Sequence, residues 1–160
     1  GGWLLPALFW AAFIGLGTLA ASYWVSVSRG STAVEVMNGD ALELRLGRSG
    51  HYEVTGSVAS LPARFIVDTG ASLVVLGRSD ALRAGIDYQK GESGQSQTAN
   101  GVVRVWVVTV DSVRVGSVTL RNVRVAVHSQ DLPMALLGMS FLNRMEMRRD
   151  NGVLSLKQRY

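Results

Sequence analysis

Hydrophobic and polar positions divide the chain into an uninterrupted apolar start and a long remainder in which the two kinds of residue alternate. No Asp, Glu, Lys or Arg precedes Arg29, and residues 3–27 form one apolar run of 25 positions. As a helix, this run would be about 37 Å long at roughly 1.5 Å per residue, which is enough to cross a hydrocarbon core of about 30 Å. The pattern therefore predicts a transmembrane anchor over residues 1–28.

Two other interpretations of this run stay open. Thr18-Leu19-Ala20 offers small residues at the spacing of a signal-peptide cleavage site, although the uncharged run is longer than a typical signal core. A buried helix of a soluble domain is the third interpretation. Trp3 at one end and Tyr23-Trp24 at the other favour the anchor, because aromatic side chains gather at membrane interfaces.

After the apolar run, the pattern changes to a polar stretch and then to short strands. Residues 29–41 are small and polar with scattered charges, which is typical of a tether. Residues 42–160 carry alternating or Val-rich runs separated by Gly, Asn and Asp, which predicts one all-β domain. Asp150-Asn151-Gly152 is expected to turn the last hairpin. We expect strands at residues 42–46, 51–58, 62–68, 73–76, 102–115, 118–128, 145–149 and 153–157.

Helix is scarce in this pattern. Residues 79–85 begin with Ser79, a residue type that caps helices, and end with Gly85, which predicts a helix of two turns. Residues 139–144 are expected to form another short helix. Residues 91–101 are rich in Gly, Ser, Gln and Asn, which is typical of a mobile loop or a hairpin tip.

The charge and composition narrow the classes of partner. The formal net charge is +4 and the sequence pI is about 10.0. The arginines of the later runs are spaced along predicted strands rather than clustered, which favours a solvated sheet face over a nucleic-acid site. These arginines are Arg104, Arg114, Arg121 and Arg124. We therefore expect no nucleic-acid partner.

Metal and cofactor chemistry is not indicated either. The chain has no cysteine, and its two histidines, His51 and His128, lie far apart with no second ligand at helical spacing. The sequence also has no phosphate-binding loop, no nucleophile elbow and no paired-histidine zinc motif. We expect no cofactor and no metal, and the candidate that remains is a single carboxylate.

That carboxylate belongs to Asp68, which follows the apolar run Phe65-Ile66-Val67 at the point where an extended strand breaks. An acid there is partly desolvated and needs hydrogen-bond donors or a function. One carboxylate cannot serve as general acid and general base at once, whereas two carboxylates that share a proton can. No second Asp-Thr-Gly or Asp-Ser-Gly occurs, so a partner carboxylate would come from a second copy of the chain.

Residues 65–72, with Asp68-Thr69-Gly70-Ala71-Ser72 at their end, are followed about 65 residues later by Ala135-Leu136-Leu137-Gly138. This combination resembles the retropepsin-like aspartic proteases, particularly their bacterial membrane-anchored group. The resemblance covers roughly residues 42–158. It implies a closed β-barrel domain and a homodimer in which each chain gives one Asp68 to a shared catalytic site.

The resemblance also implies a role for several other residues. Thr69 would hydrogen-bond across the dimer axis, and the Gly70 amide would orient the carboxylate. Structural support from behind the loop would come from Leu136, Leu137 and Gly138. A flap over an extended peptide substrate would be formed by Thr98, Ala99, Asn100 and Gly101.

Two positions of the loop bear on its chemistry: Ala71 is the residue that the retroviral enzymes also carry, whereas Ser72 differs from many of them. Ala71 stands where pepsin-like enzymes carry Ser, so a hydroxyl donor to the carboxylate is missing. Fewer donors to the ionised form predict a pH optimum that is milder than strongly acidic. Ser72 stands where many retroviral enzymes carry Asp, which puts in doubt the contact that this Asp makes.

The sequence thus predicts a membrane-anchored aspartic endopeptidase that works as a homodimer on protein or peptide substrates. Two alternatives remain: a non-catalytic peptide-binding or scaffold domain on the same fold, and a structural membrane-tethered β-domain without a cleft. The resemblance suggests that the protease domain lies outside the cytoplasm, in the periplasm. Arg29, Arg45 and Arg48 mildly favour the opposite orientation, because cytoplasmic flanks are enriched in basic residues.

Overall fold

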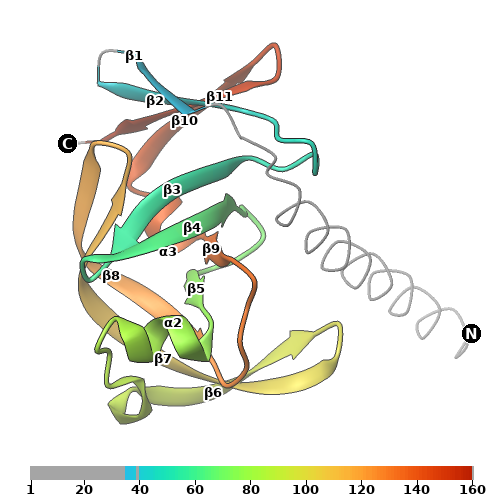
Figure 1. Cartoon of the computed structure of the whole chain (residues 1–160), viewed down its shortest axis with the longest axis vertical. Coiled ribbons are helices and arrows are strands. Elements are labelled where there is room, and N and C mark those ends of the chain that lie inside the picture. Colours follow the sequence, from blue (N-terminus) through green and yellow to red (C-terminus); the bar gives the residue numbers. More distant parts are fainter. Residues whose placement is uncertain (1–34, 39, 160) are drawn as a thin grey trace, which may run out of the picture.

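The computed structural model describes residues 35–38 and 40–159 (Figure 1). The predicted anchor, residues 1–28, and most of the predicted tether therefore lie outside the described residues. Within the described part of the chain, no helix is both long enough and apolar enough to cross a membrane.

The described residues form an all-β domain with few and short helices, as the sequence predicts. The strands are β1 (Glu35–Asn38), β2 (Ala41–Arg45), β3 (Glu53–Val58), β4 (Leu61–Val67), β5 (Val74–Leu76), β6 (Glu92–Thr98), β7 (Gly101–Val115), β8 (Val118–His128), β9 (Ala135–Leu137), β10 (Met145–Asp150) and β11 (Val153–Gln158). The helices are α2 (Arg78–Arg83), the 3-10 turn η1 (Tyr88–Lys90) and α3 (Met139–Leu142).

Seven strands form a sheet that closes on itself. Their order is β3-β4-β9-β5-β8-β7-β6, and β3 also pairs with β7, for example at Val58 and Val113. This second pairing joins the start of the sheet to the long strand near its end, so the sheet encloses a core. Phe65, Phe141 and Leu120 lie fully buried in that core, where apolar burial contributes most of the stability.

A smaller sheet of four strands, ordered β1-β2-β11-β10, packs against the barrel. Figure 1 shows it at the top of the view, with the barrel below. Leu42 and Leu44 on β2 and Leu154 and Leu156 on β11 are buried and belong to the same core cluster. Their two-residue spacing places them on one face of the sheet, as strand geometry requires.

Three strands differ from the sequence-based expectation. Residues 35–38, which were predicted to belong to the tether, form β1 and pair with β2. β6 pairs along its whole length with β7, although a polar composition like that of residues 92–98 is typical of a loop. β9 has only three residues, too few for alternation to be recognised.

The start of α2 also differs from the prediction. The N-cap residue is Gly77, and Ser79 lies inside the first turn. Ser79 instead donates both its backbone N–H, at 2.9 Å, and its hydroxyl, at 2.6 Å, to Oδ1 of Asp131. A carboxylate from a distant loop therefore does the capping expected of Ser79.

Candidate active site

Asp68 lies directly after β4, in the six-residue loop that leads to β5. Its side chain is half-buried, and Oδ1 accepts a hydrogen bond from the N–H of Gly70 at 2.9 Å. The carbonyl of Asp68 accepts the N–H of Ala71 at 3.3 Å, which closes a tight turn. Thr69 and Gly70 at the tip of this turn are exposed in the single chain. The carboxylate is thus held from one side and open on the other.

Behind the loop, β9 lies between the strands that enter and leave it. β9 runs parallel to β4, with Leu137 opposite Val67, and antiparallel to β5, with Leu136 opposite Val75. The N–H of Asp68 donates to the carbonyl of Leu137 at 3.1 Å. A backbone hydrogen bond therefore holds the loop against a strand that lies about 70 positions later in the sequence.

Gly138 follows β9 and touches the middle of the loop. A Cβ atom at Gly138 would lie 2.0 Å from the carbonyl oxygen of Leu73 and 2.7 Å from that of Ala71. Its φ of −91° is open to any residue, so the need for glycine here is one of space. The N–H of Met139 then donates to the Ala71 carbonyl at 2.8 Å. The structure thus brings Leu136, Leu137 and Gly138 together with Asp68.

Ser140, which was not among the predicted site residues, contacts the end of the loop. Its Oγ accepts the backbone N–H of Val74 at 2.8 Å and donates to the carbonyl of Arg124 at 2.7 Å. Val74 is the first residue of β5, and Arg124 lies on β8. No short sequence motif identifies a serine in this role. The available signal in the sequence was its position two residues after Gly138.

The predicted flap residues lie apart from this loop in the sequence and form the tip of the β6–β7 hairpin. Thr98 pairs with Gly101, and Ala99 and Asn100 make the turn between them. The Thr98 hydroxyl donates to the Gly101 carbonyl at 2.9 Å and accepts the N–H of Asn100 at 3.3 Å. In Figure 1 both this tip and the β4–β5 loop lie toward the right-hand side. The turn at residues 99–100 matches the predicted hairpin tip, whereas residues 92–98 form the strand β6.

Comparison with known proteins assigns the family. Residues 54–144 match a protein family described as "gag-polyprotein putative aspartyl protease". The chain is also similar to the crystal structure of a retropepsin-like aspartic protease from Rickettsia conorii, with 31% identity and a TM-score of 0.64. The match covers 78% of this chain and 96% of that one. The chain belongs to the retropepsin-like aspartic proteases.

Two curated relatives of this retropepsin-like chain are longer. An uncharacterized protein in the cobV 5' region of Sinorhizobium sp is 36% identical over 101 residues, which covers 62% of this chain and 43% of that protein. An uncharacterized protein of Rickettsia prowazekii (strain Madrid E) is 34% identical over 118 residues, or 71% and 51% of the two chains. The chain spans about half the length of these relatives.

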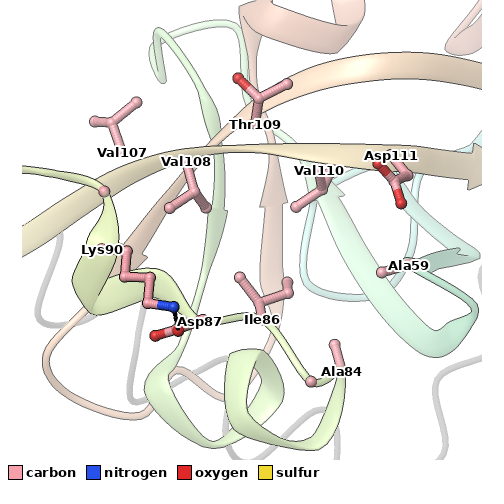
Figure 2. Close-up of a pocket in the computed structure, with 12 residues that line it drawn as sticks. Ala59, Ala84, Ile86, Asp87, Lys90, Val107, Val108, Thr109, Val110 and Asp111 are labelled. Carbon is pink, nitrogen blue, oxygen red and sulfur yellow. Dashed lines mark ion pairs between the residues drawn. The ribbon is translucent and has the colours of Figure 1, made fainter.

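The hollow shown in Figure 2 lies elsewhere on this retropepsin-like domain. It has a volume of about 590 Å³ and is lined by residues 84–87, 90–91 and 107–111 together with Ala59. An ion pair between Lys90 and Asp87, at 2.9 Å, crosses its edge. Asp68 does not line this hollow. The described residues of one chain hold no group of three or more metal-ligating side chains.

Proposed function

We propose that this chain is a membrane-anchored aspartic endopeptidase that is active as a homodimer. One observation carries the proposal: each chain supplies a single Asp-Thr-Gly loop whose carboxylate is fixed by Gly70 and whose tip is exposed. Family membership supports aspartic protease chemistry in general. The dimer, the anchor and the residue roles are inferences from the loop and the sequence.

The dimer follows from the chemistry of the carboxylate. Two carboxylates about 3 Å apart cannot both ionise, so one stays protonated while the other polarises a water molecule between them. That water would give a proton to the ionised carboxylate as it attacks the peptide carbonyl, while the protonated carboxyl would hydrogen-bond the carbonyl oxygen. The C–N bond would then break as a carboxyl donates a proton to the leaving amine. Because the chain has one Asp-Thr-Gly, the second carboxylate would be Asp68 of another copy.

The exposed tip of the loop favours this association. Thr69 and Gly70 are open to solvent in one chain, and a two-fold axis beside them would bring the two carboxylates together. In such a dimer Thr69 would bond across the axis. The β6–β7 hairpin would cover an extended peptide and exclude water from it.

Membrane anchoring would assist a weak dimer. Two chains held in one membrane by short tethers meet at a raised effective concentration, so a modest interface is sufficient. We propose that residues 3–27 form this anchor and that the protease domain lies outside the cytoplasm. The length and apolar character of the run support the anchor.

Cleavage of an unfolded protein substrate across pH 3–8 tests the chemistry, since this window brackets the titration of a shared carboxylate pair. The native chain is compared with Asp68→Asn, with and without a transition-state-mimicking inhibitor of aspartic proteases. We expect inhibitable cleavage that the variant lacks. Because Ala71 offers no hydroxyl to the carboxylate, we expect the optimum at a milder pH than that of strongly acidic enzymes. Inactivity of a native sample shown to be dimeric would favour a peptide-binding domain instead.

Mixing the two proteins tests the shared site. After subunits have exchanged in an equimolar mixture, only about a quarter of the dimers carry Asp68 in both subunits. The activity per native chain should then fall to about half of its value without the variant. An unchanged value would mean that one chain suffices, and the dimeric mechanism would be wrong.

A further inference from the structure

The loop that carries Asp68 is tied to residues 137–140 at three points. The Leu137 carbonyl accepts the N–H of Asp68 at the start, and the Met139 N–H donates to Ala71 in the middle. At the end, the hydroxyl of Ser140 accepts the N–H of Val74. The first two contacts are made by backbone groups, which almost any residue supplies. Among these three described contacts, the one at Ser140 depends on a side chain.

The hydroxyl of Ser140 is oriented for this contact by its second hydrogen bond. A serine hydroxyl has one proton to donate and two lone pairs to accept. Since the proton is directed to the Arg124 carbonyl at 2.7 Å, a lone pair faces the N–H of Val74 at 2.8 Å. Ser140 thereby joins α3, β5 and β8 at one point.

The environment makes this contact hard to replace. Val74 is fully buried, and its strand lies between β9 and β8. If Ser140 lost its hydroxyl, the N–H of Val74 would face an apolar methyl group, and a buried unpaired donor is unfavourable. The chain would relieve this by moving the end of the loop, which lies six residues after Asp68.

We propose that Ser140 is a positioning residue for the catalytic loop: its hydroxyl fixes the exit of the loop and, through it, the placement of Asp68. This inference rests on the proposed function for its catalytic consequence, and on the structure alone for its effect on the loop. Ser140 does not touch the carboxylate and acts through Val74.

Two variants of the full chain and a matched control test the role. Ser140→Ala removes the hydroxyl, and Ser140→Thr keeps it. Ser49→Ala removes another half-buried serine hydroxyl, which bonds Glu53 at 3.2 Å outside the loop. If Ser140→Ala does not fold, Ser140→Cys, a weaker hydrogen-bonding group of similar size, takes its place.

Hydrogen exchange measures the loop without any requirement for activity. We expect the amides of Gly70, Ala71 and Val74 to exchange at least about tenfold faster in Ser140→Ala than in the native chain. Ser140→Thr should retain native protection at these amides, and Ser49→Ala should change none of them. Equal protection in Ser140→Ala and Ser49→Ala would overturn the proposal.

Kinetics on a peptide substrate then separate positioning from general stability. We expect kcat to fall by about tenfold or more in Ser140→Ala, because catalysis is sensitive to displacement of reacting groups. KM should change by less than about twofold, since Ser140 is not among the residues proposed to contact the substrate. Recovery of kcat by Ser140→Thr would support the role; a loosened loop with native kcat would refute it. If the native chain shows no Asp68-dependent cleavage, the proposed function fails, and the exchange rates still decide whether Ser140 holds the loop.

Discussion

Replacing Gly138 with alanine is expected to displace the candidate catalytic loop through a single methyl group. The added Cβ would lie 2.0 Å from the Leu73 carbonyl oxygen, whereas ordinary contact begins at 3.4 Å, so the atoms must separate by about 1.4 Å. The obstructing atoms belong to the backbone, which cannot swing aside as a flexible side chain can. Overpacking of this kind costs about 3 kcal/mol when backbone must move. A displacement of about 1 Å near reacting groups lowers turnover by about a hundredfold.

The assay compares Gly138→Ala with Gly47→Ala in the full chain, in the same detergent for both. A Cβ at Gly47 meets its nearest atoms at 3.5, 3.7 and 3.8 Å, all ordinary contacts. Because both variants restrict the unfolded chain in the same way, the difference between them isolates the steric effect. Urea unfolding monitored by circular dichroism gives the free energy of unfolding. Cleavage of an unfolded substrate gives the activity.

We expect Gly47→Ala to change the unfolding free energy by no more than about 0.5 kcal/mol and to keep native activity. Gly138→Ala should lose both stability and activity. If the two variants unfold at the same urea concentration and cleave alike, the loop does not depend on the close approach of Gly138, and the steric reasoning is wrong. A stability loss with full activity would mean that the loop moves without displacing Asp68.

Three further predictions concern charged groups outside the loop. Arg64→Ala leaves the carboxylate of Glu53, which is 3% exposed, without its guanidinium partner at 3.0 Å. Because Arg64 itself is partly exposed, we expect the free energy of unfolding in urea to fall by about 1–2 kcal/mol. The loss should be smaller when Glu53→Gln is also present. Burial lowers the pKa of His128 below its ordinary 6.5, so near pH 6 the unfolded chain binds more protons than the folded chain does. The contribution of His128 to stability should therefore be complete above about pH 6.5 and fall below it. In unfolding measurements between pH 8 and 5, His128→Gln should lose this dependence. Hydrogen bonds from Ser79 lower the pKa of Asp131 below 3.8, so the contribution of Asp131 to stability is present above that pH and lost as the pH falls further. At pH 7, Asp131→Asn should show faster amide exchange at Ser79 than the native chain. Equal exchange rates would contradict the capping role.

The sequence predicted the architecture well wherever a strand buries one face or ends in a marked turn. Residues 118–128 were expected as a strand and form β8 with the same bounds. Asn151 and Gly152, with φ of 47° and 76°, make the expected hairpin turn between β10 and β11. In such segments local pattern and tertiary contact require the same conformation, so the pattern is sufficient.

Where a strand forms only because a partner lies beside it, the sequence was insufficient. β6 has a mostly exposed, polar set of side chains, and what makes it a strand is pairing with the valine-rich β7 from Glu92 to Thr98. β1 lies at an edge of the small sheet and likewise takes its conformation from β2. Backbone hydrogen bonds to a neighbour are not encoded in the side chains of the segment itself.

The support behind Asp68 shows the same division between what side chains encode and what the fold supplies. Leu136-Leu137-Gly138 was recognisable because Leu137 must be apolar to be buried and Gly138 must be small to let Leu73 approach. The hydrogen bond from the N–H of Asp68 to the Leu137 carbonyl is made by backbone groups alone, so no residue type in the sequence indicates it. Ser140 falls between these cases, since its hydroxyl is specific but its two partners are backbone groups on β5 and β8. Changes within the loop, such as Ala71 or Ser72, therefore leave its backbone anchors intact, whereas changes at Gly138 or Ser140 act on the anchors themselves.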